Sequence, residues 1–330
     1  MTKRTTRQNP DDVAMKLWLA WEKVHQDPPQ ILYHYTAAEG LLGMLQSRQM
    51  WATNVRFMND TSELDYGIRL VREIFEEKEF VDQPSANIRT AFRPYREGIF
   101  AMLDDAEQNT KHFAVSFCEN ENLLSQWRGY GQSGGGFALG LETQRLGEFA
   151  AEIVPNSSVT SAEIGVFLRR VIYDRNSQQA LVQSWVRALV KSLESHRKAT
   201  KVASDDERLF SSVARLLYEC LVCFKHPGFH EEREWRLIQQ GRVGNTDVTK
   251  VDFRARTGRI VSYTPLTFRP KTAARTVESH DANTLPLAAI TYGPTLDPQA
   301  AERALRSLLE SRGYVPGRVG IRPSGIPFTT

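Results

Sequence analysis

Two short segments, far apart in the sequence, carry the side chains best suited to chemistry. The first reads Ile-Leu-Tyr-His-Tyr-Thr and places His34, Tyr35 and Thr36 at the end of an apolar strand, just before an expected helix. Strand ends of this kind suit anionic ligands, because the backbone N–H groups of the first helical turn attract negative charge. The second segment, residues 229–238, supplies the carboxylates that the first one lacks. Together they predict a binding or catalytic site.

Glu232, Glu234 and Arg236 alternate in the second segment. On an extended strand all three would project to one side. Two carboxylates on one face can hydrogen-bond a ribose hydroxyl and stabilise a developing oxocarbenium ion. The alternative is a salt-bridged edge strand in which Arg236 neutralises its neighbours, and the spacing leaves both interpretations open.

Two acidic motifs have a simpler structural explanation. Thr36 and Glu39 match a capping box, in which a hydroxyl and a carboxylate bond the free amides of a helix N-terminus. Asp60 and Glu63 repeat that spacing just before an apolar helix, so we also expect them to cap.

The histidine has no comparable structural role in the sequence. Side chains alternate along a strand, so His34 and Tyr35 should point to opposite faces, and we expect only one of them to face a given cleft.

A glycine-rich connection, residues 125–136, offers a third candidate. Its glycines are explained by a loop that joins two strands, since the spacing of a dinucleotide or phosphate loop is missing. Within it, Trp127 could give a ligand a stacking surface and Arg128 a phosphate contact.

A possible zinc site proves weak on inspection. Cys220, Cys223, His226 and His230 are suitable ligand types at compact spacing. Cys220, however, falls on the apolar face of an expected helix, where a free cysteine behaves as a small hydrophobe, so no metal is expected.

The elements that must position these residues follow from hydrophobic periodicity. Helices are expected at residues 11–24, 41–45, 64–75, 92–103, 181–193, 209–224 and 299–309. Strands are expected to end at 33–36 and to lie at 113–117, 136–141, 235–238, 259–263, 288–292 and 318–322, with 113–117 and 136–141 as neighbours. This order favours an α+β fold with mixed or antiparallel sheets over a regular alternation.

Composition indicates a folded, soluble protein. Of the 330 residues, 41% are hydrophobic and 25% charged, and the 42 Lys and Arg against 39 Asp and Glu do not point to nucleic acid. Three cysteines and the lack of a membrane-length apolar run predict a cytoplasmic protein without membrane association. We expect a helical extension at residues 1–30 and a single α+β domain at 31–330, and the oligomeric state stays open.

The motifs also occur in a familiar order. Leu-Tyr-His-Tyr-Thr with Gly-Leu-Leu, Trp-Ala-Thr with Asn-Asp-x-x-Glu, Ser-Phe-Cys with Gln-Trp-x-x-Tyr, Glu-x-Glu-Trp-Arg and a final Ser-Gly-Ile-Pro follow one another between Leu32 and Pro327. This set resembles a bacterial family catalogued as domain of unknown function 2971. The outline is also similar to the ADP-ribosyltransferase superfamily, which includes DNA-modifying toxins, although no Ser-Thr-Ser strand can be placed.

The second resemblance implies a reaction and its residues. His34 would hydrogen-bond a ribose of NAD, Tyr35 or Tyr66 would stack on nicotinamide, Glu234 would be the catalytic carboxylate, and Glu232 would orient the substrate. NAD would be a substrate, and ADP-ribose would pass to a macromolecular acceptor, protein or nucleic acid, in an antiphage or toxin-type effector. An NAD glycohydrolase and a non-enzymatic nucleotide-sensing or interaction module are the alternatives.

Overall fold

The computed structural model describes residues 10–58, 62–81, 86–131, 134–154, 165–196, 203–243, 246–256, 258–270 and 284–327. The chain forms two compact units, each assembled from separate stretches of sequence. The helical unit takes Met1–Gln26, Asn59–Thr110 and Ile172–Phe229, and the sheet unit takes Asp27–Met58, Lys111–Val171 and His230–Thr330. This division differs from the predicted boundary at residue 30, because the N-terminal helix groups with helices from two later stretches.

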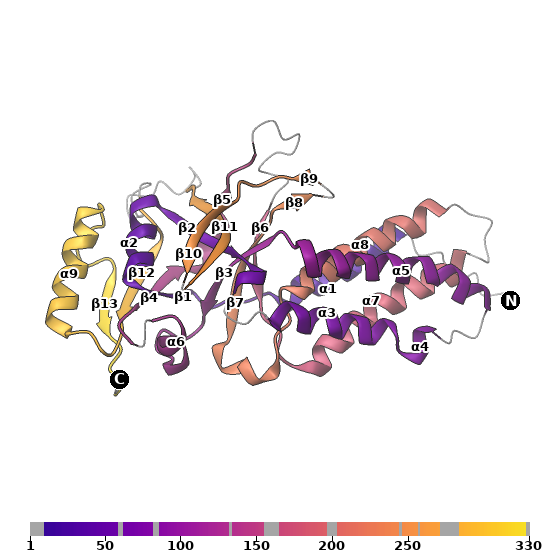
Figure 1. Ribbon diagram of the computed structural model, residues 1–330, viewed down its shortest axis with the longest axis horizontal. Coiled ribbons are helices and arrows are strands. Elements are labelled where there is room, and N and C mark those ends of the chain that lie inside the picture. The colour runs from indigo at the N-terminus through magenta and orange to yellow at the C-terminus, as the bar shows by residue number, and fades with distance from the viewer. Residues whose placement is uncertain are drawn as a thin grey trace. The chain divides into compact units, whose positions relative to one another are not determined.

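The helical unit confirms the expected early and central helices (Figure 1). Its elements are α1 (Pro10–Val24), α3 (Ser62–Phe75), α4 (Lys78–Val81), α5 (Ala86–Asn109), α7 (Arg175–His196) and α8 (Ala203–Leu221). In α3, Leu64, Ile68, Val71 and Phe75 repeat at helical spacing and are all buried, so one apolar face holds the helix in the unit. In the part of the chain that is described, no helix combines the length and apolar character needed to cross a membrane.

The sheet unit contains a sheet that, among the described residues, has 11 strands. These are β1 (Ile31–Thr36), β2 (Gln49–Asn54), β3 (His112–Cys118), β4 (Phe137–Glu142), β5 (Phe149–Ala151), β6 (Val166–Arg170), β7 (Glu234–Gln240), β10 (Asp252–Arg256), β11 (Arg259–Phe268), β12 (Leu287–Tyr292) and β13 (Gly320–Pro323). The short pair β8 (Arg242–Val243) and β9 (Thr246–Asp247) lies outside it. Pairing is antiparallel except between β12 and β13, which confirms the α+β class with a largely antiparallel sheet.

The strand order corrects one prediction. The order is β10-β11-β2-β3-β1-β4-β12-β13, with β7 paired to β3 and β6, and β5 paired to β11. The expected neighbours β3 and β4 are therefore separated by β1. The connection between them contains the helix α6 (Leu124–Gly129) and is long enough to cross β1, which pairs with β4 along its whole length.

One edge of β3 is shared between two strands, and this creates an opening in the sheet. Phe113 and Ala114 pair with β2, whereas near the other end Cys118 pairs with Tyr33 of β1. Tyr33–Cys118 is the single residue pair in the register of β1 with β3, so these strands separate beyond it. On its other edge β3 pairs with β7 from His112 to Cys118.

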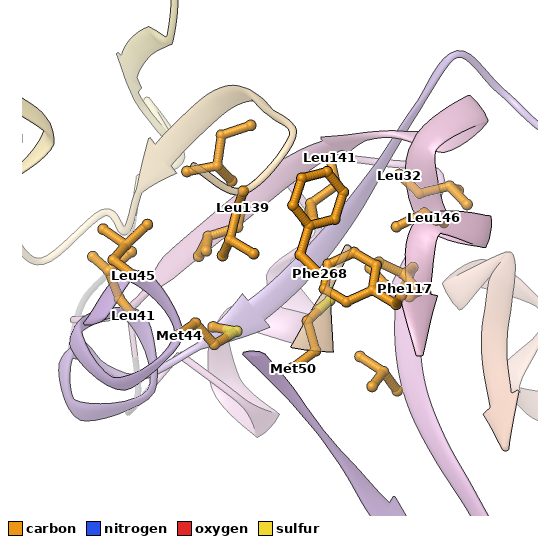
Figure 2. Packing of buried hydrophobic residues seen from close by; sticks show 14 of the residues in the cluster. Leu32, Leu41, Met44, Leu45, Met50, Phe117, Leu139, Leu141, Leu146 and Phe268 are labelled. Carbon is orange, nitrogen blue, oxygen red and sulfur yellow. The ribbon is translucent and has the colours of Figure 1, made fainter. Parts of the chain in front are cut away.

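A hydrophobic core packs against one face of the sheet. The helix α2 (Ala38–Ser47) contributes Leu41, Met44 and Leu45, which Figure 2 shows beside Leu139 and other strand residues. A second helix, α9 (Pro298–Ser311), adds Leu305 and Leu309 to the same cluster. Both helices were predicted. Their burial fixes the strands that hold the candidate site.

Candidate functional site

A pocket in the sheet unit opens where β1 and β3 separate. Its lining residues are Tyr33, His34, Tyr35, Ser116, Phe117, Cys118, Gln126, Tyr130, Glu232 and Glu234. The empty space around these residues, counted together with the open solvent at the mouth, is about 340 Å³. The histidine and both glutamates predicted from the sequence therefore lie together.

The pocket corrects the expectation that only one of His34 and Tyr35 can face a given cleft. Both line it, together with Tyr33. Alternation separates side chains only across an intact sheet. Because β1 leaves β3 after Tyr33, residues from both faces of β1 reach the opening.

A backbone carbonyl fixes the protonation of His34. Its Nδ1 lies 2.9 Å from the carbonyl oxygen of Ser116. A carbonyl oxygen only accepts hydrogen bonds, so Nδ1 must carry the proton. In the neutral ring Nε2 is then an acceptor, suited to a ligand hydroxyl.

Ser116 is also one of the pocket residues. Its hydroxyl is buried and has no hydrogen-bond partner among the described residues. An unsatisfied buried polar group costs about 1–3 kcal/mol. A ligand that bonds this hydroxyl would remove that cost.

The hydroxyl of Tyr35 both donates and accepts a hydrogen bond. It donates to the carbonyl of Asn120 at 3.0 Å and accepts from the N–H of Leu123 at 2.9 Å. Burial raises the pKa of Tyr35 well above its ordinary value, so the phenol stays protonated. The ring forms a fixed wall of the pocket.

Trp127 does not offer the stacking surface predicted for it. Its side chain is 0% exposed, its ring meets Tyr35 edge to face at 4.9 Å, and its indole N–H donates to Oδ1 of Asn122 at 2.8 Å. Trp127 therefore supports Tyr35 from behind. The first part of the predicted loop, residues 125–129, belongs to the helix α6. Arg128 on this helix is exposed and is not among the pocket residues.

The capping box predicted at α2 is wrong. The N-cap is Ala37, one residue later than predicted, and it forms no side-chain cap hydrogen bond. Thr36 is the last residue of β1 and is not among the pocket residues. A Cβ on Gly40 would lie 2.0 Å from the Thr36 hydroxyl oxygen, so the helix turn packs directly on this threonine.

The second predicted capping motif, Asp60 with Glu63, can be followed only at Glu63. Asp60 lies outside the described residues. Glu63 is buried in the helical unit and forms an ion pair with Lys225, with 2.8 Å between Oε1 and Nζ. Because both partners are almost completely buried, Glu63 serves packing in this unit.

Glu234 begins β7 and is 4% exposed. Its carboxylate receives two hydrogen bonds from Arg236, from Nε at 2.7 Å and from Nη2 at 2.9 Å. The predicted salt bridge is present, but β7 is no edge strand, because it pairs with β3 on one side and β6 on the other.

Glu232 reaches the pocket without lying on the strand. It ends the 3₁₀ helix Pro227–Glu232, so the predicted alternation of Glu232 with Glu234 on one strand is wrong. Arg233 between them has a φ of 42°, and this left-handed residue turns the chain so that both glutamates are pocket residues. The carbonyl of Glu232 accepts a hydrogen bond from Sγ of Cys118 at 2.6 Å.

The loop after β3 ties the pocket walls together. Glu119 accepts from the indole N–H of Trp235 at 2.9 Å, next to Glu234. Glu121 hydrogen-bonds Tyr33 and accepts from Arg322 at 3.1 Å. Two acidic residues of one loop thus hold both β7, which begins with Glu234, and β1, which carries His34.

The sequence interpretation missed Tyr33, Ser116, Phe117, Cys118, Gln126 and Tyr130 as pocket residues. A signal existed for Ser116 and Cys118 of the Ser-Phe-Cys motif. They alternate on β3, and Cys118 and Ser116 are in register with Glu234 and Arg236 of β7. That register depends on long-range strand pairing, which periodicity does not reveal.

Tyr66 belongs to the helical unit. Its hydroxyl donates to Oε1 of Gln178 at 2.7 Å, and its ring meets His226 edge to face at 5.9 Å. The pocket is built from residues of the sheet unit. A role for Tyr66 in stacking on nicotinamide stays a prediction.

The described residues contain no group of three or more His, Cys, Asp and Glu side chains arranged to hold a metal ion. Cys220 is 0% exposed and donates to the carbonyl of Leu217 at 2.9 Å. Burial raises the pKa of its thiol, which opposes formation of the thiolate that binds metals.

Comparison with known proteins supports one of the two resemblances. Residues 126–237 match the model of a family described as a protein of unknown function, DUF2971. The matched region runs from the pocket residue Gln126, through Glu232, to Glu234 and Arg236 of β7. No curated protein and no solved structure matches the chain. The chain is thus similar, over this region, to a family for which no activity is described.

Proposed function

We propose that this protein is an NAD-dependent ADP-ribosyltransferase acting on a macromolecular acceptor, and that its sheet unit has an ADP-ribosyltransferase-like fold. One observation carries the proposal. His34, expected to bind a ribose of NAD, and Glu232 and Glu234, expected to act on that ribose, line one pocket although they come from distant segments.

The pocket suits one end of NAD. The pocket would take the nicotinamide and its ribose, and the rest of the dinucleotide would lie outside it. Nε2 of His34 would accept a hydrogen bond from a ribose hydroxyl. The Ser116 hydroxyl would bond the ligand, and the half-buried ring of Tyr33 or Tyr130 would provide the aromatic contact that Tyr35 and Trp127 are too enclosed to give.

The proposed reaction breaks one bond and forms one. The bond between the nicotinamide nitrogen and the ribose anomeric carbon breaks, and its electron pair leaves with neutral nicotinamide. Glu234 accepts a hydrogen bond from the ribose hydroxyl and stabilises the positive charge that develops on the sugar. A nucleophilic atom of the acceptor then bonds the anomeric carbon and loses its proton to Glu232 or water.

The test is nicotinamide release and the fate of labelled ADP-ribose. Purified protein would be given NAD labelled in the adenosine half, with lysate protein and nucleic acid as separate acceptors. We expect Glu234→Gln to lower the release rate by at least about 10²-fold, the scale of losing one electrostatic contact in a transition state. Glu231→Gln is the matched control, because Glu231 is exposed and is not among the pocket residues.

Each outcome has a distinct meaning. Label retained on protein or nucleic acid supports transfer and identifies the acceptor class. Free ADP-ribose alone identifies a glycohydrolase. Equal release by the wild type, Glu234→Gln and Glu231→Gln contradicts the assignment of the pocket, and tight NAD binding without release identifies a nucleotide-sensing module.

A further inference from the structure

The carboxylate assigned to catalysis has an unusual partner on its own strand. Glu234 and Arg236 are two residues apart on β7 and therefore project from the same face. The two hydrogen bonds of 2.7 and 2.9 Å form a fork that holds both carboxylate oxygens. Arg236 is 2% exposed and is not among the pocket residues, so it meets the pocket through Glu234.

The residues in register with Glu234 and Arg236 on the neighbouring strands offer neither of them a partner of opposite charge. Glu234 lies opposite Cys118 of β3, and Arg236 lies between Ser116 of β3 and Arg169 of β6. No acidic residue is in register with Arg236 on either neighbouring strand. The guanidinium therefore reaches along its own strand to Glu234, across a spacing of roughly 6.6 Å between their Cα atoms.

Stability is a poor explanation for keeping such a pair in the sheet. Removing two charges from water costs several kcal/mol per ion, and apolar replacements of buried pairs are often neutral or stabilising. Beside a pocket, such a pair can instead orient the carboxylate toward a ligand. An ionised carboxylate has about four lone-pair positions. The fork of Arg236 uses two of them and fixes the orientation of the carboxylate beside the pocket.

We propose that Arg236 is a positioning residue for the proposed NAD-cleaving reaction, which holds Glu234 in one orientation and keeps it anionic beside the ribose. The inference rests on the proposed function. Without this guanidinium, Glu234 would lose two hydrogen bonds that favour its ionised form, and the protonated acid cannot stabilise a positive sugar.

Other ionisable groups share the pocket with Glu234 or lie in register with Arg236, and they must be considered in a pH experiment. They are Tyr33, His34, Tyr35, Cys118, Tyr130, Arg169 and Glu232. They are unchanged in a variant of Arg236. A difference between the wild type and that variant therefore reports on the pair itself.

The first experiment is the pH profile of nicotinamide release. We expect Arg236→Met to lower kcat by about 10²-fold, to change KM for NAD by less than about threefold, and to move the acidic limb to higher pH. Arg236→Lys keeps the charge but loses the fork, so it should recover part of kcat. Arg170→Met is the matched control, because Arg170 is exposed and in register with Trp235, on the opposite face of β7.

A second measurement does not need activity. Glutamate labelled with carbon-13 at the side-chain carboxyl would be incorporated, and the Glu234 signal identified by its absence in Glu234→Gln. We expect this signal to titrate at higher pH in Arg236→Met than in the wild type. If Arg236→Met does not fold, Arg236→Lys replaces it in both experiments, with a smaller shift in the same direction.

The two measurements separate the inference from the proposed function. A folded Arg236 variant with wild-type kcat and an unchanged acidic limb overturns the inference. Failure of the wild-type protein to cleave NAD overturns the proposed function. The carboxyl titration then decides whether Arg236 holds Glu234 in its ionised form. A shifted midpoint supports the role of Arg236 in holding Glu234 ionised, and an unchanged midpoint contradicts it.

Discussion

The side chain of His34 is held by a backbone carbonyl of β3 that would bond the backbone of β1 in an intact sheet. The carbonyl of Ser116 lies on the edge of β3 from which β1 has separated, and Nδ1 of His34 bonds it. This contact was not predictable from the sequence, because it arises from the separation of two strands. The residue type was informative nonetheless, since an imidazole at this strand end had no evident structural use.

Changing His34 to asparagine tests the role of its outer nitrogen. The amide N–H of asparagine can replace Nδ1 in the bond to the Ser116 carbonyl, but nothing replaces Nε2. We expect His34→Asn to weaken binding of an uncleavable NAD analogue by about tenfold, the value of one hydrogen bond, with little change in melting temperature. Calorimetric titration measures this, and undiminished affinity would refute the ribose contact.

Arg233 is the second residue with local consequences. Its φ of 42° is costly for a residue with a side chain, and Gly, Asn or Asp would have signalled such a turn in the sequence. An arginine gives no such signal. The prediction of a strand that includes Glu232 failed for this reason.

Replacement of Arg233 by glycine should stabilise the sheet unit. We expect Arg233→Gly to raise the free energy of unfolding by about 1 kcal/mol by removing the left-handed penalty. Arg233→Ala keeps that penalty and removes the side chain, so it controls for the weak contact with Glu119 at 3.8 Å. Urea unfolding compares the variants. Equal stability of the glycine and alanine variants would show that the backbone is not strained.

At the scale of elements, the existence of strands was easier to predict than their pairing. Apolar runs located β1, β3, β4, β7 and β12, because burial imposes a local pattern. The insertion of β1 between β3 and β4 depends on contacts between distant residues. Periodicity also failed to indicate β2 and β6, although β2 contributes Met50 and Ala52 to the core.

Substitution of Gly140 on β4 tests whether this strand positions the Tyr33 ring. The two residues are in register, and a Cβ on Gly140 would lie 2.8 Å from Cε1 of Tyr33 and 2.9 Å from Cγ2 of Ile31. Gly140→Ala should push the Tyr33 ring from its place and weaken NAD binding by about tenfold. Gly147→Ala is the matched control, because a Cβ there meets nothing within 4 Å. Equal affinities in both variants would exclude a role for the Tyr33 ring.

At the scale of the whole molecule, the sequence concealed the division into two units. Each unit takes residues from three separate stretches, and no change in composition marks where the chain passes from one to the other. Helices and strands were mostly predicted correctly, whereas their grouping into these two units is not marked in the sequence. Grouping follows from which apolar faces pack together, and that is decided by long-range contacts.

His112 predicts how stability depends on pH. Burial lowers the pKa of His112 to about 4, below its ordinary value near 6.5. As the pH falls from about 6.5 to 4, His112 becomes protonated in the unfolded chain but stays neutral in the folded chain, so the free energy of unfolding decreases. At pH 5 the loss from this group approaches about 2 kcal/mol.

Comparison with His112→Gln isolates this contribution. Melting temperatures at pH 7.5 and pH 5 would be measured for both proteins, and all other ionisable groups are shared. The fall on acidification should be smaller for His112→Gln than for the wild type. An equal fall in both would show that His112 accepts a proton in the folded protein.

The most direct measurement of the central claim is a crystal structure of the protein with an NAD analogue whose nicotinamide–ribose bond cannot be cleaved. The account predicts a ribose hydroxyl within hydrogen-bond distance of both Nε2 of His34 and the carboxylate of Glu234, with Arg236 still paired to that carboxylate. An analogue bound elsewhere, or one whose ribose contacts neither His34 nor Glu234, would contradict the account.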